Sequence, residues 1–211
     1  MRGDLVYLDR VRDSDDAERL AEWGAGISQV YSSGGPTIMT REQVEAAVRS
    51  PGFNVLMVRA IDDDQPVGMV TWQQKTYHGS YTTGVAIGDA ERWGSGMGME
   101  AMMLLVSHLF HTLNAHRLHI EVAAYNIGML PIFTGGMVKI EGVLRDYFFV
   151  DGEYHDCIVG SMLRDEYYRI AETFGGPPHA ISADHKAAAR ELVSTMLEER
   201  GLGVLGRSGT V

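Results

Sequence analysis

The sequence predicts an α/β protein with a mixed, mostly antiparallel sheet flanked by helices. Runs rich in β-branched and aromatic residues follow one another across short turns such as Asp151-Gly152, which is a strong signal for an antiparallel hairpin. One strand–turn–helix–strand unit, from about Tyr81 to Ala123, is inserted between these hairpins. This order of elements implies a mixed sheet with helices on both faces.

The first elements are expected to be a strand and a capped helix. A short β-rich run at Leu5–Leu8 predicts the strand. Ser14-Asp15-Asp16 then offers an N-cap and acidic first-turn residues for a helix that runs to about Trp23. The segment Gly24–Pro36 is expected to be irregular.

A second helix and a hairpin follow. Thr40 begins a capping pattern for a helix that ends before Ser50-Pro51-Gly52. Asn54–Ala60 and Pro66–Trp72 are β-rich runs, and the acidic turn at 62–65 between them predicts a hairpin.

The central unit begins after a turn at His78-Gly79-Ser80. A strand is expected at Tyr81–Ile87, a helix at about Met97–Leu113 and the next strand at Leu118–Ala123. Asn126–Gly136 predicts only a weak helix, because it contains a proline and ends in two glycines.

The last part of the chain combines a hairpin with an appended segment. Gly142–Val150 and Glu153–Leu163 are expected as paired strands. Gly175-Gly176-Pro177-Pro178 is typical of a linker, Ser182–Glu199 predicts a capped helix, and Gly201–Val211 is expected to be a frayed tail.

Composition limits the kinds of protein that this chain can be. With 211 residues, 45% of them hydrophobic and 22% charged, it fits a soluble protein with one domain over residues 1–170 and a linker, helix and tail over 171–211. The formal charge of −10 argues against nucleic-acid binding and mildly favours a cationic partner. Cys157 is the single cysteine, so no intrachain disulfide can form. The N-terminus lacks an apolar signal region and no segment is typical of a membrane span, so we expect a cytoplasmic protein with no membrane partner.

The most informative motif is a glycine-rich turn, Trp93-Gly94-Ser95-Gly96-Met97-Gly98, directly before the central helix. Without Cβ atoms the backbone can approach an anion closely, and the helix directs unpaired N–H groups and its positive dipole end to the same place. A Walker-type loop would need Gly-Lys-Ser/Thr where Met99 and Glu100 follow, and a dinucleotide fingerprint would need two residues between Gly96 and Gly98. Both patterns fit poorly, which leaves another phosphate ligand or a plain strand-to-helix connection.

Three further stretches stand downstream of this turn at fitting distances: Asn126, Glu141–Tyr147 and Val150–Asp156. Together with the turn, they resemble the GNAT superfamily of acyl-CoA-dependent N-acyltransferases. Within it they are similar to the RimJ/RimL-like group, which acetylates protein N-termini and small amines. The resemblance runs from about Leu5 to Tyr168 and implies a GNAT-type sheet, with the C-terminal helix as an addition.

The resemblance also implies an acetyl-CoA site built mainly from the backbone. The strand end Val85-Ala86-Ile87 would pair with the pantetheine arm like an added β-strand, and an N–H near Val85 would polarise the thioester carbonyl. Asn126 would contact the pantetheine arm. The pyrophosphate would be held by Trp93, Gly94, Ser95, Gly96, Met97 and Gly98.

The catalytic groups are less well defined by the sequence. Glu121, which shares a strand face with His119, is the expected general base, with a salt-bridged or solvated strand residue as the alternative. Asp146 could hold a cationic amine or activate water, or it could pair with Arg145. Tyr125 could supply a proton donor.

Trp93 departs from the family pattern, which has Gln or Arg there, although an aromatic residue occurs in the RimJ/RimL-like group. Two further departures concern the proton donor. Met129 and Phe133 stand where relatives carry Ser and Tyr, and neither can protonate a leaving thiolate. No metal is expected, because His116 and His119 have helix-like spacing but lack an evident third ligand.

The sequence therefore predicts direct transfer of an acyl group from acetyl-CoA, or a related acyl-CoA, to a primary amine of a small molecule or a peptide N-terminus. The alternative is a GNAT-fold protein that has lost transfer activity and acts as a CoA-binding or scaffolding subunit. The C-terminal helix could pack on a second subunit of a homodimer.

Overall fold

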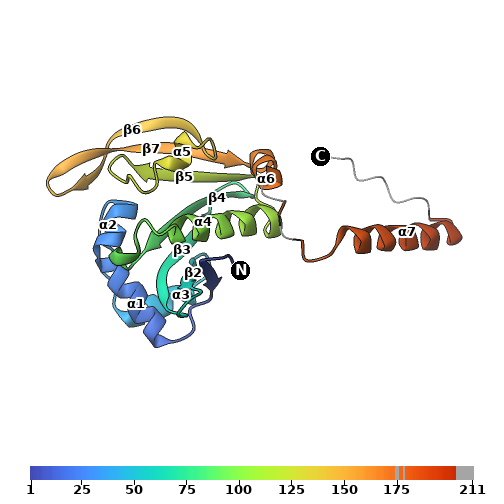
Figure 1. Cartoon of the computed structure of the whole chain (residues 1–211), viewed down its shortest axis with the longest axis horizontal. Coiled ribbons are helices and arrows are strands. Elements are labelled where there is room, and N and C mark those ends of the chain that lie inside the picture. The colour runs from blue at the N-terminus through green and yellow to red at the C-terminus, as the bar shows by residue number, and fades with distance from the viewer. Residues whose placement is uncertain (174–175, 178, 203–211) are drawn as a thin grey trace. The chain divides into compact units, whose positions relative to one another are not determined.

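The computed structural model describes residues 1–173, 176–177 and 179–202 and contains one mixed sheet. Its strands are β1 (Val6–Asp9), β2 (Asn54–Ala60), β3 (Pro66–Gln74), β4 (Ser80–Ile87), β5 (Arg117–Ala123), β6 (Lys139–Val150) and β7 (Glu153–Leu163). They follow the order β1-β2-β3-β4-β5-β7-β6, and every neighbouring pair is antiparallel except β4–β5 (Figure 1). The predicted mixed, mostly antiparallel sheet is therefore confirmed.

Helices flank this sheet in the first of two units, Met1–Gly175. They are α1 (Ser14–Ala25), α2 (Ile27–Ser33), α3 (Arg41–Val48), α4 (Met97–Ser107), α5 (Pro131–Thr134) and α6 (Arg164–Thr173). A 3-10 turn at Ala90–Arg92 precedes α4, and a π-helical turn at His108–Thr112 follows it. The predicted helix over 97–113 is thus present, with its last turn widened.

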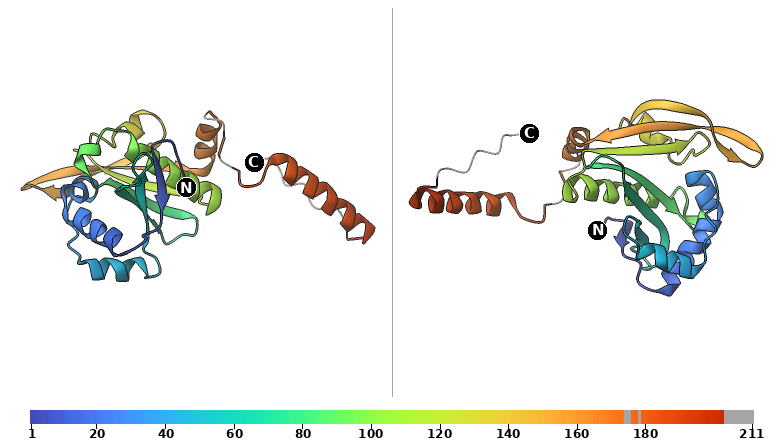
Figure 2. Two further views of the ribbon diagram at one scale, coloured as in Figure 1. Left: turned by 60° about the horizontal axis from the view of Figure 1, so that its bottom comes forward. Right: turned by 180° about the vertical axis from the view of Figure 1, so that it is seen from behind.

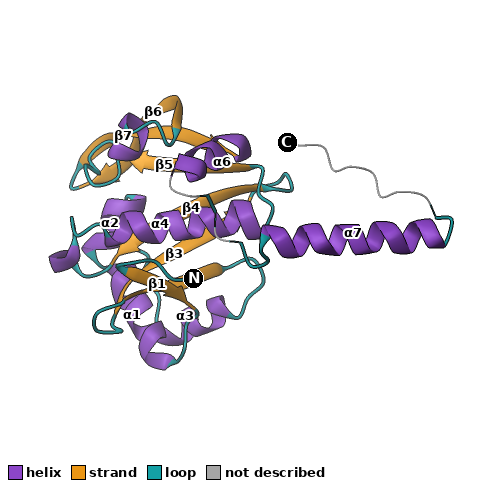
Figure 3. Ribbon diagram, turned by 45° about the vertical axis from the view of Figure 1, so that its right-hand side comes forward, coloured by secondary structure: helices purple, strands orange, loops and turns teal. Residues whose placement is uncertain are grey.

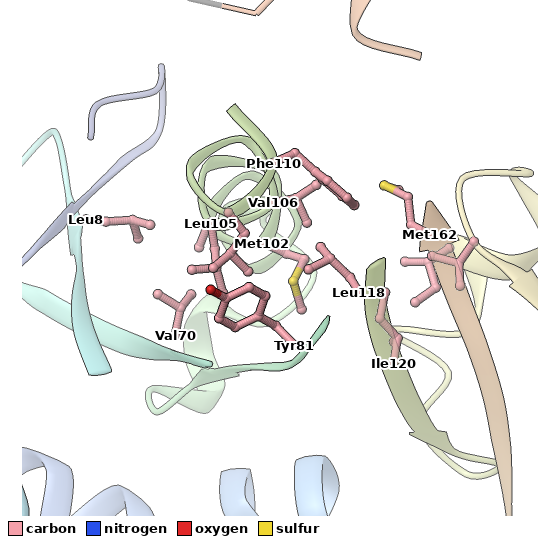
Figure 4. Packing of buried hydrophobic residues seen from close by; sticks show 14 of the residues in the cluster. Leu8, Val70, Tyr81, Met102, Leu105, Val106, Phe110, Leu118, Ile120 and Met162 are labelled. Atoms are coloured by element: carbon pink, nitrogen blue, oxygen red, sulfur yellow. The ribbon is translucent and has the colours of Figure 1, made fainter. Parts of the chain in front are cut away.

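The side chains of β2 alternate between two hydrophobic cores. Val55 and Met57 pack with α1 and α3, whereas Val58 and Ala60 pack with α4. Successive side chains of a strand point to opposite faces, so α1 and α3 cover one face of the sheet and α4 covers the other (Figure 3). Figure 4 shows the α4 side of the core, with labelled residues that include Val70, Tyr81, Met102, Leu105 and Leu118.

The main correction to the predicted fold is α2, which lies in the segment expected to be irregular. Gly26 precedes this helix without a side-chain cap, and Gly34 closes it. Because neither end carries a Ser, Thr, Asp or Asn cap, the sequence lacks the signal that predicts a helix start. The helix packs against β4 and β5, and this tertiary contact stabilises it in place of a cap.

Smaller corrections concern helix ends. Asp13, not Ser14, caps α1, because its carboxylate accepts a hydrogen bond from Asp16 N at 3.0 Å. The weak helix expected over 126–136 is reduced to α5, which begins at Pro131, where the missing N–H costs nothing. The helix α6 was not predicted. The capping box of Thr40 with Gln43 is confirmed.

The second unit, Gly176–Val211, contains α7 (Ala183–Glu199), which Ser182 caps as predicted. Parts of the predicted linker, at 175 and 178, and most of the predicted tail, at 203–211, lie outside the described residues. No helix in the described segments has the length and apolar character needed to cross a membrane.

A buried ion pair joins α1 to β2. Arg59 Nη2 lies 2.6 Å from both carboxylate oxygens of Asp16, and the two side chains are 6% and 5% exposed. Asp16 also accepts a hydrogen bond from Arg12 N. Removing one member of such a pair leaves a buried charge without compensation.

We therefore expect Asp16→Asn to lower the free energy of unfolding by about 3–5 kcal/mol, measured by urea denaturation. The double variant Asp16→Asn with Arg59→Met should recover much of that loss, because it also removes the uncompensated guanidinium. A loss below about 1 kcal/mol in the single variant would contradict this role, since exposed pairs contribute no more than that.

A second ion pair makes stability depend on pH. Arg117 Nη1 on β5 lies 2.9 Å from Glu141 Oε1 on β6, and Ser161 Oγ donates to the same oxygen at 2.8 Å. Arg117 and Ser161 hold the pKa of Glu141 down, from 4.5 to about 2. Because the folded pKa is depressed, the stabilisation is present above pH 4.5 and is lost as pH falls towards 2.

Glu141→Gln should therefore be less stable than the wild type at pH 7, and the two should converge as pH is lowered from 4.5 towards 2. The effect is expected to be modest, because the Glu141 side chain is 40% exposed and solvent screens the pair. Thermal unfolding at a series of pH values measures it. A stability difference that does not vary with pH would contradict the assignment.

Candidate active site

The two parallel strands β4 and β5 separate along their length. They pair only at Ser80–Thr82 with Arg117–His119. Beyond this point β4 remains paired with β3 as far as Ile87, and β5 remains paired with β7 as far as Ala123. The sheet therefore opens between the C-terminal halves of two neighbouring strands (Figure 1).

A cavity of about 930 Å³ occupies this opening. Its wall includes Thr83 and Val85 of β4, Glu121 of β5 and Met102 of α4. Since Met102 belongs to the α4 side of the sheet and Glu121 to the opposite side, the cavity passes between the strands from one face to the other. In this wall, the buried Thr83 Oγ1 has no hydrogen-bond partner among the described residues.

The glycine-rich turn lies just beyond the end of β4. Gly94 and Gly96 have φ values of 76° and 89°, in the left-handed region that glycine adopts at little cost. Trp93 Nε1 donates to Ile87 O at 2.8 Å, which ties the turn to the open end of β4. Gly96 is the N-cap of α4 and offers no side chain to the first-turn amides. Met97 N donates to Ser95 Oγ at 3.4 Å, and the other first-turn N–H groups and the helix dipole are available to an anion at this end of the opening.

His119 and Glu121 project from β5 into the same cavity. They are two residues apart, so they share one face, and His119 Nε2 lies 3.0 Å from Glu121 Oε1. The side chains are 21% and 34% exposed, so both remain accessible from the cavity. In the described residues, no group of three or more His, Cys, Asp or Glu side chains is arranged to hold a metal ion.

A family model described as the acetyltransferase (GNAT) domain matches residues 6–134. The chain belongs to the GNAT acetyltransferase family. A curated relative, an uncharacterized N-acetyltransferase p20 from Bacillus licheniformis, is 32% identical over 75 residues. That match covers 36% of this chain and 42% of the relative, so the chain aligns with less than half of the relative's length.

Solved structures share the fold. Spermidine N-acetyltransferase from Vibrio cholerae, in complex with CoA and spermine, has a TM-score of 0.68 at 18% identity, covering 78% of this chain and 99% of that one. Ribosomal-protein-S5-alanine acetyltransferase from Vibrio fischeri has a TM-score of 0.63 at 17% identity, covering 79% and 97%. At these identities the likeness shows the GNAT fold alone.

The GNAT sheet places three of the predicted cofactor residues in the cavity wall and the glycine-rich turn beyond the end of β4. Val85, Ala86 and Asn126 line the cavity, and the turn over 93–98 lies beyond Ile87. Gly98 packs against the end of β4, because a Cβ there would lie 3.2 Å from Ile87 Cγ1. Contact of these residues with acetyl-CoA remains a prediction.

Asn126 and Tyr125 have clear structural roles in this GNAT domain. Asn126 Nδ2 donates to Tyr31 O at 3.1 Å, and its Oδ1 accepts from Met129 N at 3.2 Å. Tyr125 OH donates to Val30 O at 2.9 Å, and burial raises its pKa. Both side chains thus fix α2 against the end of β5. Tyr125 is not among the described residues of the cavity wall, so its predicted donor role gains no support from the geometry.

Asp146 is also placed apart from the other predicted catalytic residues. It has a φ of 52° within an irregular stretch of β6, and its N–H donates to Asp156 Oδ1 at 3.0 Å. It does not occur among the described residues that line the cavity, whereas Glu121 does. A role in amine binding remains a prediction for Asp146, and its observed role is to shape the strand.

The sequence did not predict the aromatic part of the cavity wall that follows Asp146. Tyr147, Phe148 and Phe149 all line the cavity. Such a run is expected to alternate between two faces of a strand, but the register between β6 and β7 shifts between Leu144 and Phe148. The alternation of residues in the sequence predicts a regular strand and does not predict this register shift. The β6–β7 hairpin that carries it projects beyond the rest of the first unit (Figure 2).

Proposed function

We propose that this protein transfers an acyl group, most simply acetyl, from acyl-CoA to a primary amine, in the manner of the RimJ/RimL-like group that it resembles. The observation that carries the proposal is the opening between β4 and β5. A glycine-rich turn that begins α4 lies at one end of this opening, and the Glu121 carboxylate lies in its wall. Acetyl-CoA would supply the activated thioester.

The edge of β4 that faces the opening supports a binding site for the acyl donor. Beyond Thr82, every second residue of β4 directs its N–H and C=O groups away from β3 and into the opening. A pantetheine arm contains amide groups that can pair with this edge as an added strand. Thr83 Oγ1, which has no hydrogen-bond partner within the described part of the chain, offers a further hydrogen bond there. An N–H near Val85 would then polarise the thioester carbonyl.

The acceptor would enter from the α1–α2 side of the cavity. Gly34, Thr37 and Phe53 contribute to the same cavity wall as Glu121. The net charge of −10 favours a cationic acceptor. Structural relatives are named for spermidine and for an alanine of a ribosomal protein, and these names motivate testing both small polyamines and peptide N-termini.

Glu121 would accept the proton that the attacking amine releases. Direct acyl transfer needs orientation of the two substrates, a polarised carbonyl and a proton acceptor within reach. Glu121 is the single carboxylate among the described residues of the cavity wall, and its hydrogen bond to His119 fixes its position.

Thiol release from acetyl-CoA across a panel of polyamines, amino acids and peptides tests this function. We expect release that depends on the amine and is abolished when the amine nitrogen is fully methylated. Tight binding of acetyl-CoA without amine-dependent release would contradict it and would be the result expected of a CoA-binding protein that has lost transfer activity.

A further inference from the structure

We propose that Tyr147 is the proton donor to the departing thiolate and that Glu121 and Tyr147 form one proton path across the cavity. This inference rests on the acyl transfer proposed above. It also supplies the acid that Met129 and Phe133 cannot provide, since neither a thioether nor a phenyl ring carries a transferable proton.

The composition of the cavity wall carries the argument. Among its described residues, the ionisable side chains are those of His119, Glu121 and Tyr147. Phe133 is 9% exposed and lies in the α4 core, and Tyr125 OH is bonded to Val30 O. Tyr147 is therefore the one phenol among the described residues that line the cavity.

The irregular stretch of β6 explains why Tyr147 reaches this space. The register shifts between Leu144 and Phe148, and Asp146 adopts its left-handed conformation with its N–H held by Asp156. Extra residues on one strand of an antiparallel pair redirect the side chains that follow. The Tyr147 ring then packs edge-on against Phe148, with 4.9 Å between ring centroids, which restricts its orientation.

Tyr147 and Glu121 are coupled electrically. The negative charge of Glu121 raises the pKa of Tyr147, and burial of the phenol raises it further. A phenol with a raised pKa stays protonated at neutral pH, so it is available as an acid. His119 Nε2 lies 3.0 Å from Glu121 Oε1, which restrains the carboxylate in the cavity wall.

The proposed step balances without a further reactant. The amine nitrogen forms a bond to the acyl carbon, the carbon–sulfur bond breaks, and the proton of the amine passes to Glu121. The thiolate takes the phenol proton of Tyr147, and the protonated Glu121 returns a proton to the phenolate. The net result is an amide, a free thiol and unchanged side chains.

Tyr147→Phe tests the donor, because it removes the hydroxyl and keeps the ring. We expect kcat for thiol release to fall about a hundredfold while the KM for acetyl-CoA changes less than threefold. Tyr154→Phe is the matched control, since Tyr154 lies on the same hairpin, is 64% exposed and is not in the described cavity wall. Wild-type rates with Tyr147→Phe would overturn the proposal and leave acyl transfer standing.

A titration independent of activity tests the coupling. The ultraviolet difference between wild type and Tyr147→Phe isolates the ionisation of Tyr147, and we expect it to move to lower pH in Glu121→Gln. Placing 3-fluorotyrosine at position 147, which makes the phenol more acidic, should shift the alkaline limb of kcat to lower pH. An ionisation of Tyr147 that ignores Glu121, or an unchanged limb, would overturn the proposal, whereas absence of thiol release in the wild type would overturn the proposed function itself.

Discussion

Glu121→Gln is expected to lower amine-dependent thiol release by roughly a thousandfold while leaving the Kd of acetyl-CoA unchanged. Glutamine keeps the size of the side chain and can still bond to His119 Nε2, which lies 3.0 Å from Glu121 Oε1. It cannot accept the proton of the amine. The loss should therefore appear in kcat rather than in donor binding, and stopped-flow thiol detection with isothermal titration measures both.

Glu141→Gln is the matched control for this experiment. Glu141 lies on β6, where it is bonded to Arg117 and Ser161, and it is not among the described residues that line the cavity. Its removal should change stability without lowering kcat more than a few-fold. If both variants lost the same amount of activity, the loss would reflect reduced stability of the sheet. That result would contradict the role of Glu121 as general base.

Gly94→Asp should weaken acetyl-CoA binding by roughly a hundredfold. A Cβ at Gly94 meets no atom within 4 Å, so a side chain there would occupy the space in which the pyrophosphate would lie. An added carboxylate would repel that anion, and two like charges about 4 Å apart cost a few kcal/mol near a protein surface. Isothermal titration with acetyl-CoA measures the change.

Gly152→Asp separates this charge effect from backbone strain. Gly152 lies in the β6–β7 turn with a φ of 84°, close to the 76° of Gly94, and its Cβ direction is equally open. Aspartate is tolerated in the left-handed region here, as at Asp64 and Asp151. Both variants should lose similar stability, and only Gly94→Asp should lose affinity. Equal affinity in the two variants would contradict a pyrophosphate site at the turn.

The parts of the fold that depend on local interactions could be predicted from the sequence. The glycine turn was predictable because Gly94 and Gly96 adopt positive φ values that other residues avoid. The mixed sheet was predictable from the hairpin turns and from one inserted helix, because parallel neighbouring strands must be joined by a crossover connection, which is usually a helix. The capping box of Thr40 was equally local.

Features that depend on distant contacts were not predictable. The helix α2 begins and ends at glycines and is stabilised by packing on β4 and β5. The placement of Tyr147 depends on a register shift and on the bond from Asp146 N to Asp156. The roles of Tyr125 and Asn126 as supports for α2 likewise require a partner about 95 residues away. The glycine-rich turn beyond β4 was therefore predictable from the sequence, whereas the aromatic part of the cavity wall was not.

Mass analysis of the acceptor after reaction with acetyl-CoA distinguishes acyl transfer from thioester hydrolysis. We expect a primary amine, such as a polyamine or a peptide N-terminus, to gain one acetyl group for each thiol released. We also expect Glu121→Gln to suppress both products together while still binding acetyl-CoA. Thiol release that leaves every amine unmodified would show hydrolysis of the thioester instead of transfer and would contradict the proposed function.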